Sequence, residues 1–466
     1  MIKSRVGLTV VAALAVLLSG CAASGGAGGA GGGGGVGTGT PPRDNDFTRS
    51  ADFFLIQATQ ADDPADRYRE ALVAATNAIN EAPNNPLGYF LAGRAQLGLE
   101  DYVAADTLFS KALELYTGYR EEIRVERENA WINLFNASLD AGDTDEGIGL
   151  LEDAEVIFHR QRPEALINLG VFLGNAGRYD EAADAYGAAI EIITGPRIAE
   201  VNDTTAADWR TRLQSASFNR ARVLTLGERY EDAVAAYGTY LETEPGDIQA
   251  LTGLAQALVT SGQPDSAQAI YNNLLESPGL GLRIYMEIGV GLYNADVYDQ
   301  AARAFQAASS ISPRNRDAVY NLAQSLFEAE AWTELIPVAQ QLMDLDGNNP
   351  QSHLLLGYAL ARTDREEEAG AVLEASEALA FTIDSYQLQP RTGGGATVGA
   401  MLTNRTLEEG TAIEIRVHFS GEDGSEIGTV DVRVDAPPQE QARQVTAEIR
   451  SSEIVAGFYF EVLSPR

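Results

Sequence analysis

The chain has 466 residues, of which 33 are Lys or Arg and 67 are Asp or Glu, so its formal net charge is −34 at pH 7. This charge argues against a nucleic-acid partner, because binding to phosphates requires clustered Lys and Arg. The single cysteine excludes an internal disulfide and a multi-cysteine metal site. The length allows about two to four domains, which must be held together by packing.

Residues 1–20 have the pattern of a secretory signal peptide. A positively charged start precedes an apolar run, residues 6–18, which is too short to span a bilayer. The sequence Leu18-Ser19-Gly20-Cys21 then resembles the lipobox of bacterial lipoproteins. That resemblance implies cleavage before Cys21 and lipid attachment to it, and the following Ala22 implies the outer membrane. We therefore expect a lipid-anchored protein of the cell envelope that faces the periplasm. The alternative is an ordinary signal peptide with an incidental cysteine.

Residues 21–50 are expected to form the acylated start of the mature chain and a flexible tether. Residues 22–40 include 11 glycines, and two prolines follow. Such a segment buries too little apolar surface to offset the chain entropy lost on folding. The tether would let the folded part stand away from the membrane.

Residues 51–383 contain an internal repeat with a period near 34 residues. One unit contains the sequences Leu166-Ile167-Asn168-Leu169-Gly170 and Gly177-Arg178-Tyr179-Asp180-Glu181-Ala182, and it resembles the tetratricopeptide (TPR) repeat. This resemblance implies a mainly α fold, an α-solenoid of about nine helix pairs. The equivalent starting residues, of which the last five are 34 residues apart, are Asp52 in a degraded copy, Pro86, Glu128, Pro163, Gln214, Ile248, Leu282, Arg316 and Pro350.

Small and large residues alternate at fixed positions of the repeat. Position 8, where two helices cross, is small, as at Gly93 and Gly289, and position 24 is large, as at Phe109 and Phe305. We expect the large side chain to fill the gap to the next helix pair. Two insertions interrupt the period. Residues 120–127 are expected to lengthen a helix, and residues 197–213 to form either a bend or a projecting helix.

Residues 384–466 are predicted to form a separate small β-sandwich of Ig-like type. Apolar and polar residues alternate there in short runs separated by Gly, Asp and Pro. The module loosely resembles envelope modules of the FxLYD type, and we expect it to cover the exposed end of repeat nine. The predicted strands are Ala396–Thr403, Ala412–Phe419, Ile427–Val434, Gln444–Arg450 and Phe458–Leu463.

The sequence contains no recognisable catalytic or metal-binding motif. Its three histidines are isolated from one another, and HExxH, GxSxG and Walker patterns are missing. We therefore predict no enzymatic activity, no catalytic residue, no metal site and no cofactor. His353, on the first helix of repeat nine, is expected to pack between helices.

The resemblance to TPR proteins implies a binding groove lined by the first helix of each repeat. Asparagine recurs at position 6, and its amide could pair with the main chain of an extended peptide. The alternative is that these amides make local hydrogen bonds. Aromatic and arginine side chains at other groove positions would supply further contact area. The predicted groove residues are Asn133, Asn168, Asn219, Asn321, Phe90, Arg94, Arg222, Tyr293, Tyr320, Phe327 and Tyr358.

These expectations together describe a membrane-anchored scaffold that binds a protein or an extended peptide in the bacterial cell envelope. Such a protein could act as an assembly or regulatory factor. One alternative is a lipoprotein that captures a nutrient glycan, although that class carries larger loop insertions than the 17 residues found here. Another alternative is a structural spacer without a groove ligand.

Overall fold

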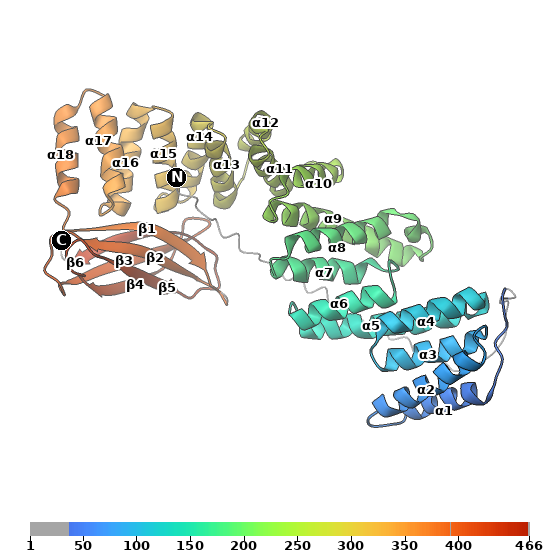
Figure 1. Ribbon diagram of the computed structural model, residues 1–466. Coiled ribbons are helices and arrows are strands. Elements are labelled where there is room, and N and C mark those ends of the chain that lie inside the picture. Colours follow the sequence, from blue (N-terminus) through green and yellow to red (C-terminus); the bar gives the residue numbers. More distant parts are fainter. Residues whose placement is uncertain (1–36, 392, 465–466) are drawn as a thin grey trace. The chain divides into compact units, whose positions relative to one another are not determined.

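A computed structural model describes residues 37–391 and 393–464 of the chain. The predicted signal peptide, Cys21 and most of the glycine-rich tether lie outside the described residues. The described residues divide into two compact units, residues 37–240 and residues 241–464, and each unit is described by itself (Figure 1). Within the described residues, no helix is both long enough and apolar enough to cross a membrane.

The first unit is a row of helix pairs (Figure 1). From α3 onward, each odd-numbered helix is the first helix of a repeat and the even-numbered helix after it is the second. Its helices begin where the sequence offers capping groups. The side chains of Asn85 and Asp101 accept hydrogen bonds from the first turns of α3 and α4, and Pro86 begins α3. The helices are α1 (Asp46–Ala58), α2 (Ala65–Glu81), α3 (Pro86–Gly98), α4 (Tyr102–Leu115), α5 (Arg120–Ala141), α6 (Asp145–Ile157), α7 (Pro163–Asn175), α8 (Tyr179–Thr194), α9 (Asp203–Leu226) and α10 (Tyr230–Thr243), whose last residues lie in the second unit.

The start of the helical part differs from the prediction. Helix α1 begins at Asp46, six residues before the expected start at Asp52, because Asn45 forms a capping box with Thr48. The described part of the predicted tether contacts the helices. The amide of Thr38 donates to the hydroxyl of Thr117 at 2.8 Å, so the described residues just before α1 lie against the second repeat.

The two insertions become parts of long first helices. Residues 120–127 form the start of α5, as predicted. Residues 203–213 form the first turns of α9 and pack against α8 through Trp209, which is 1% exposed and contacts Ile192 and Ile193. This insertion is therefore neither a bend nor a projecting helix. Its helix folds back on its neighbour because a large indole is buried there.

The second unit begins with a further row of helix pairs. Its helices are α11 (Ile248–Thr260), α12 (Pro264–Leu275), α13 (Leu282–Asn294), α14 (Tyr298–Ile311), α15 (Arg316–Glu328), α16 (Trp332–Asp346), α17 (Pro350–Arg362) and α18 (Glu366–Glu377). In this unit, a Cβ atom added to Gly289 would lie 2.6 Å from the ring of Phe305. Positions 8 and 24 therefore meet within one helix pair, whereas the sequence analysis expected position 24 to fill the gap to the next pair.

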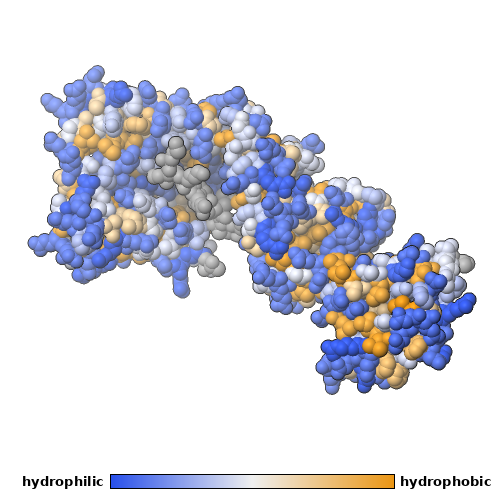
Figure 2. All heavy atoms as spheres, viewed as in Figure 1, coloured by the Kyte–Doolittle hydropathy of each residue, from blue (hydrophilic) through white to orange (hydrophobic). Residues whose placement is uncertain are grey.

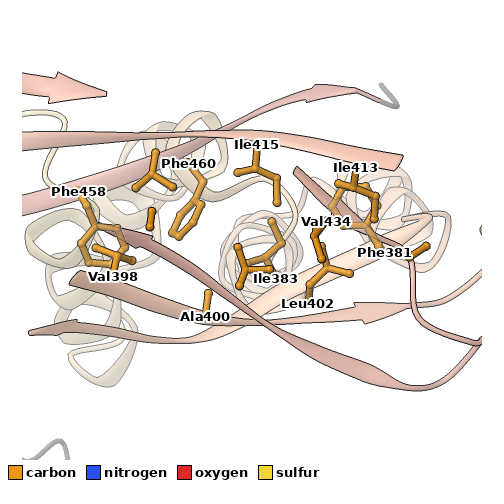
Figure 3. Close-up of a cluster of buried hydrophobic side chains, with 14 of the residues drawn as sticks. Phe381, Ile383, Val398, Ala400, Leu402, Ile413, Ile415, Val434, Phe458 and Phe460 are labelled. Carbon is orange, nitrogen blue, oxygen red and sulfur yellow. The ribbon is translucent and has the colours of Figure 1, made fainter. Parts of the chain in front are cut away.

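The second unit ends in two three-stranded antiparallel sheets, with strand orders β1-β2-β5 and β4-β3-β6. Inward-facing side chains such as Leu402, Ile415 and Phe458 form one buried core between the sheets (Figure 3). The predicted strands are confirmed, and a further strand, β1, precedes them. The strands are β1 (Phe381–Pro390), β2 (Ala396–Asn404), β3 (Ala412–Gly421), β4 (Glu426–Asp435), β5 (Ala442–Ile449) and β6 (Val455–Ser464).

This β module packs against the loops before α15 and after α16, and the prediction that it covers the end of repeat nine is wrong. The side chain of Asn315 donates to the carbonyl of Ala456 at 2.9 Å, and the amide of Ile383 donates to the carbonyl of Asn348 at 2.9 Å. The last helix needs no such cover, because α18 exposes glutamates such as Glu367 and Glu374 on its surface. A polar outer face solvates the end of a solenoid by itself.

Candidate functional site

The predicted groove residues lie on first helices of the repeats in both units. Six belong to the first unit and five to the second. Those of the first unit are Phe90 and Arg94 on α3, Asn133 on α5, Asn168 on α7, and Asn219 and Arg222 on α9. Those of the second unit are Tyr293 on α13, Tyr320, Asn321 and Phe327 on α15, and Tyr358 on α17.

The position-6 asparagines differ in what their amides do. The side chains of Asn133, Asn168 and Asn321 make no hydrogen bond to any residue that the structure describes, although their helices are well formed. The side-chain oxygen Oδ1 of Asn219, in contrast, accepts a hydrogen bond of 3.2 Å from the guanidinium of Arg222. Three of the four amides are therefore available to a ligand, and Asn219 follows the alternative of local bonding.

Phe90 and Arg94 are already engaged by side chains outside their own helix. The ring of Phe90 stacks on Tyr119 at a centroid distance of 4.7 Å. Arg94 forms an ion pair of 2.9 Å with Glu126 on α5, and its guanidinium lies 5.9 Å from the Phe90 centroid. Because both side chains are already engaged across helices, they contribute to packing between repeats more than to an open surface.

The aromatic residues of the second unit are brought together on neighbouring first helices. The ring of Phe327 meets that of Tyr358 edge to face at 5.8 Å, so α15 and α17 share one aromatic surface. Tyr358 is 53% exposed and Leu354, one turn before it on α17, is 38% exposed. This is an apolar surface accessible to a partner, with the free amide of Asn321 on the same helix as Phe327.

The β module contacts the start of α15. The guanidinium of Arg316 lies between the rings of Tyr320 and Tyr386, 4.4 Å from each centroid. Arg316 also donates to the carboxylate of Asp346 at 2.9 Å, and the hydroxyl of Tyr386 donates to the same carboxylate. Burial raises the pKa of the Tyr386 hydroxyl well above its usual value, and the adjacent Asp346 carboxylate adds to the shift. Tyr386 was not among the residues predicted from the sequence, because strand β1 was not predicted.

The charge on the groove helix α13 is balanced locally. Arg283 forms an ion pair of 2.8 Å with Glu287, one turn later on the helix. Burial raises the pKa of the Glu287 carboxyl, an effect that Arg283 opposes. This helix therefore presents no unpaired arginine that could clamp the carboxylate of a ligand.

Two further surfaces lie away from the predicted groove. In the first unit, Phe47, Phe54 and Val73 line a shallow apolar hollow of about 340 Å³ on α1 and α2, and apolar residues are visible on these N-terminal helices in Figure 2. In the second unit, a cleft of about 700 Å³ between α16 and the β module is lined by residues that include His418 and Tyr459.

The histidines have structural contacts. His353 is 3% exposed, and its Nδ1 lies 3.3 Å from the carbonyl of Asn349, so its predicted packing role is confirmed. His418 stacks on Tyr459 at 4.2 Å, and its ring nitrogens lie 3.0 Å from Glu426 and 3.3 Å from Glu461. Among the residues that the structure describes, no cluster of three or more His, Cys, Asp and Glu side chains is arranged to hold a metal ion.

Sequence comparison identifies the helical repeats. Residues 132–196, 225–278 and 288–350 match family models described as tetratricopeptide repeat. Three segments of the helical part therefore resemble TPR units. A protein of Caenorhabditis elegans, tetratricopeptide repeat protein 8, is 24% identical to it over 296 residues, which are 59% of this chain and 54% of that protein. This chain thus spans about half the length of that curated relative.

Solved structures of MamA are similar over a smaller part of this chain. One, titled MamA MSR-1 C2, is 17% identical, covers 36% of this chain and 95% of its own, and has a TM-score of 0.31. Another, MamA 41-end from Desulfovibrio magneticus RS-1, is 20% identical, covers 36% and 94%, and also has a TM-score of 0.31.

Proposed function

We propose that this TPR protein is a scaffold that binds an extended segment of a partner protein along the first helices of its repeats. The observation that carries the proposal is the set of free amides on Asn133, Asn168 and Asn321, which lie at the same position of three repeats. An amide offers a donor and an acceptor together, so it can pair with a peptide main chain whatever its sequence.

The aromatic surface of α15 and α17 supports the same proposal. Tyr358 and Phe327 form a partly exposed edge-to-face pair, and Asn321 lies on the same helix as Phe327. Tyrosine and phenylalanine lose little side-chain entropy on binding and are common at the centres of protein interfaces. A partner segment that buries this pair would gain affinity there, while the free amides would hold its backbone.

The glycan-capture alternative has less support. Its sugar site would require an exposed aromatic residue on the insertion, yet Trp209 is buried against α8 and donates to Glu164 at 3.2 Å. The spacer alternative predicts no function for the free asparagine amides.

A substitution of three asparagines tests the proposal. We expect Asn133→Ala, Asn168→Ala and Asn321→Ala in one chain to weaken capture of a partner from envelope extracts by at least about tenfold, since three lost hydrogen bonds at about 0.5–1.5 kcal/mol each cost about 1.5 kcal/mol or more together. The helical circular dichroism should not change. The control carries Asn77→Ala and Asn273→Ala, two exposed asparagines on second helices. Equal capture by the triple variant and the control would contradict the groove.

We further propose that the protein is anchored to the outer membrane, facing the periplasm, through lipid on Cys21. The support is the sequence Leu18-Ser19-Gly20-Cys21 after an apolar run, followed by a glycine-rich segment. Cys21→Ser should move the protein from the membrane fraction to the soluble fraction of the envelope. If this variant still sediments with membranes, the anchor at Cys21 is wrong.

A further inference from the structure

Two consecutive corners of the second unit, where a first helix turns into its second helix, are built alike. The α13–α14 corner contains Tyr293 and Tyr298, and the α15–α16 corner contains Phe327 and Trp332, each residue 34 positions after its counterpart. The ring pairs are T-shaped in both corners, at 5.2 Å and 67° in the first and 5.4 Å and 86° in the second. The 34-residue period therefore places an equivalent aromatic pair in each of two consecutive repeats.

The α15–α16 corner holds a cation from the chain itself. The guanidinium of Arg362, on the next first helix, lies 5.3 Å from the centroid of the Trp332 ring. This distance is within the range of a cation–π interaction. Arg362 makes no ion pair with any residue between 37 and 464 that the structure describes, so the aromatic ring is its recorded partner.

The α13–α14 corner has an acid where its neighbour has that arginine. Glu328 lies 34 residues before Arg362, and it interacts electrostatically with both Tyr293 and Tyr298. A second carboxylate, that of Asp296, accepts a hydrogen bond of 2.6 Å from Tyr298. Both acids are exposed, and neither forms an ion pair with the rest of the described chain.

We propose that the α13–α14 corner binds an arginine side chain of the partner segment. The guanidinium would lie against the ring of Tyr298 as that of Arg362 lies against Trp332 one repeat later, with Glu328 and Asp296 as counter-charges. Arginine suits the site better than lysine, because a planar guanidinium stacks on a ring and pairs with a carboxylate at the same time. This inference rests on the proposed function, since the arginine belongs to the segment bound in the groove.

Titration with a minimal ligand tests the corner directly. The probe is Nα-acetyl-arginine amide, compared with the citrulline analogue, which has nearly the same shape but no charge. Binding is followed by NMR of the full-length protein with labelled tyrosine rings. We expect the signals of Tyr293 and Tyr298 to shift on titration, and the citrulline analogue to bind about fivefold or more weakly. Equal binding of the two probes, or unchanged signals of both tyrosines, would overturn the proposal.

Substitutions at the corner give a second test. Glu328→Arg places the chain's own guanidinium there, as in the neighbouring corner, and should abolish the shift at Tyr298. Arg362→Glu should create a second site beside Trp332. Glu367→Arg makes the same charge change on the exposed surface of α18 and should leave binding unchanged. If Glu328→Arg binds the arginine probe like the unchanged protein, the corner is not the site.

The outcomes for the corner and for the groove are distinguishable. A partner that requires the free asparagines but binds Glu328→Arg normally would refute the arginine site and leave the scaffold function standing. Binding of the arginine probe at Tyr298 without capture of any partner by the unchanged protein would refute the scaffold function instead.

Discussion

The guanidinium of Arg316, in the first turn of α15, lies 4.4 Å from the centroid of the Tyr386 ring in β1. Arg316 is 6% exposed and its carboxylate partner Asp346 is 3% exposed. The buried ion pair joins α15 to α16, and strand β1 is joined to both by the ring of Tyr386 against Arg316 and by the hydrogen bond from its hydroxyl to Asp346. These contacts attach strand β1 to the start of α15 and the end of α16.

Replacing Arg316 should strongly destabilise the second unit. In Arg316→Met the carboxylate of Asp346 stays buried without its charged partner, which costs about 3–5 kcal/mol. Urea unfolding followed by circular dichroism measures the loss, and limited proteolysis reports release of the β module. Arg314→Met is the matched control, because Arg314 is exposed and donates to the Tyr459 hydroxyl at 2.8 Å. Its loss should cost about 1 kcal/mol or less, and similar losses in the two variants would contradict the buried pair.

Adding one methyl group at Gly289 should destabilise the repeat that contains it. A Cβ at this position would lie 2.6 Å from the Phe305 ring, and such overpacking costs about 1–3 kcal/mol. Gly370→Ala on α18 is the control, since a Cβ there meets nothing within 4 Å. That substitution should be neutral or stabilise the helix by up to about 1 kcal/mol. A thermal unfolding midpoint that falls equally in both variants would argue against close packing at position 8.

The lengthened start of α9 should depend on Trp209. Trp209→Ala removes an indole that is 1% exposed and contacts α8, at a cost of about 3–5 kcal/mol. The rate of amide hydrogen exchange in residues 203–213 should rise in this variant. Trp209→Phe keeps most of the apolar contact but loses the hydrogen bond to Glu164, so its cost should be smaller. Unchanged exchange in Trp209→Ala would mean that this segment is held by other contacts.

The titration of Tyr298 should report on the α13–α14 corner. The hydrogen bond to Asp296, with a smaller effect of burial, raises the pKa of Tyr298 from 10.0 to about 12. Because the folded value is the higher one, the stability that this interaction contributes is present below pH 10 and is lost between pH 10 and about 12. In Asp296→Asn the pKa should return toward 10.0, as measured by NMR of the labelled ring. A pKa that stays near 12 in this variant would exclude the carboxylate as the cause.

The sequence predicted the repeat register and five of the six strands well, because both depend on local periodicity. Small residues such as Gly289 and large ones such as Phe305 recur at fixed spacing wherever two helices cross. Strand β1 was missed for an equally local reason. Its register shifts between Asp384 and Gln387, and Ser385 has a positive φ of 56°, so the alternation of inward and outward residues is interrupted.

The sequence by itself determined the 34-residue period of the helix pairs, and the groove positions, which the resemblance to TPR proteins implies, stay a prediction. Only the tertiary structure decided which groove residues are free. Arg94 pairs with Glu126 on another helix, whereas the amides of Asn133, Asn168 and Asn321 make no hydrogen bond to the described residues. Packing also decided where the β module sits, through Arg316 and its partners. These outcomes depend on contacts between residues distant in the chain, which no local pattern encodes.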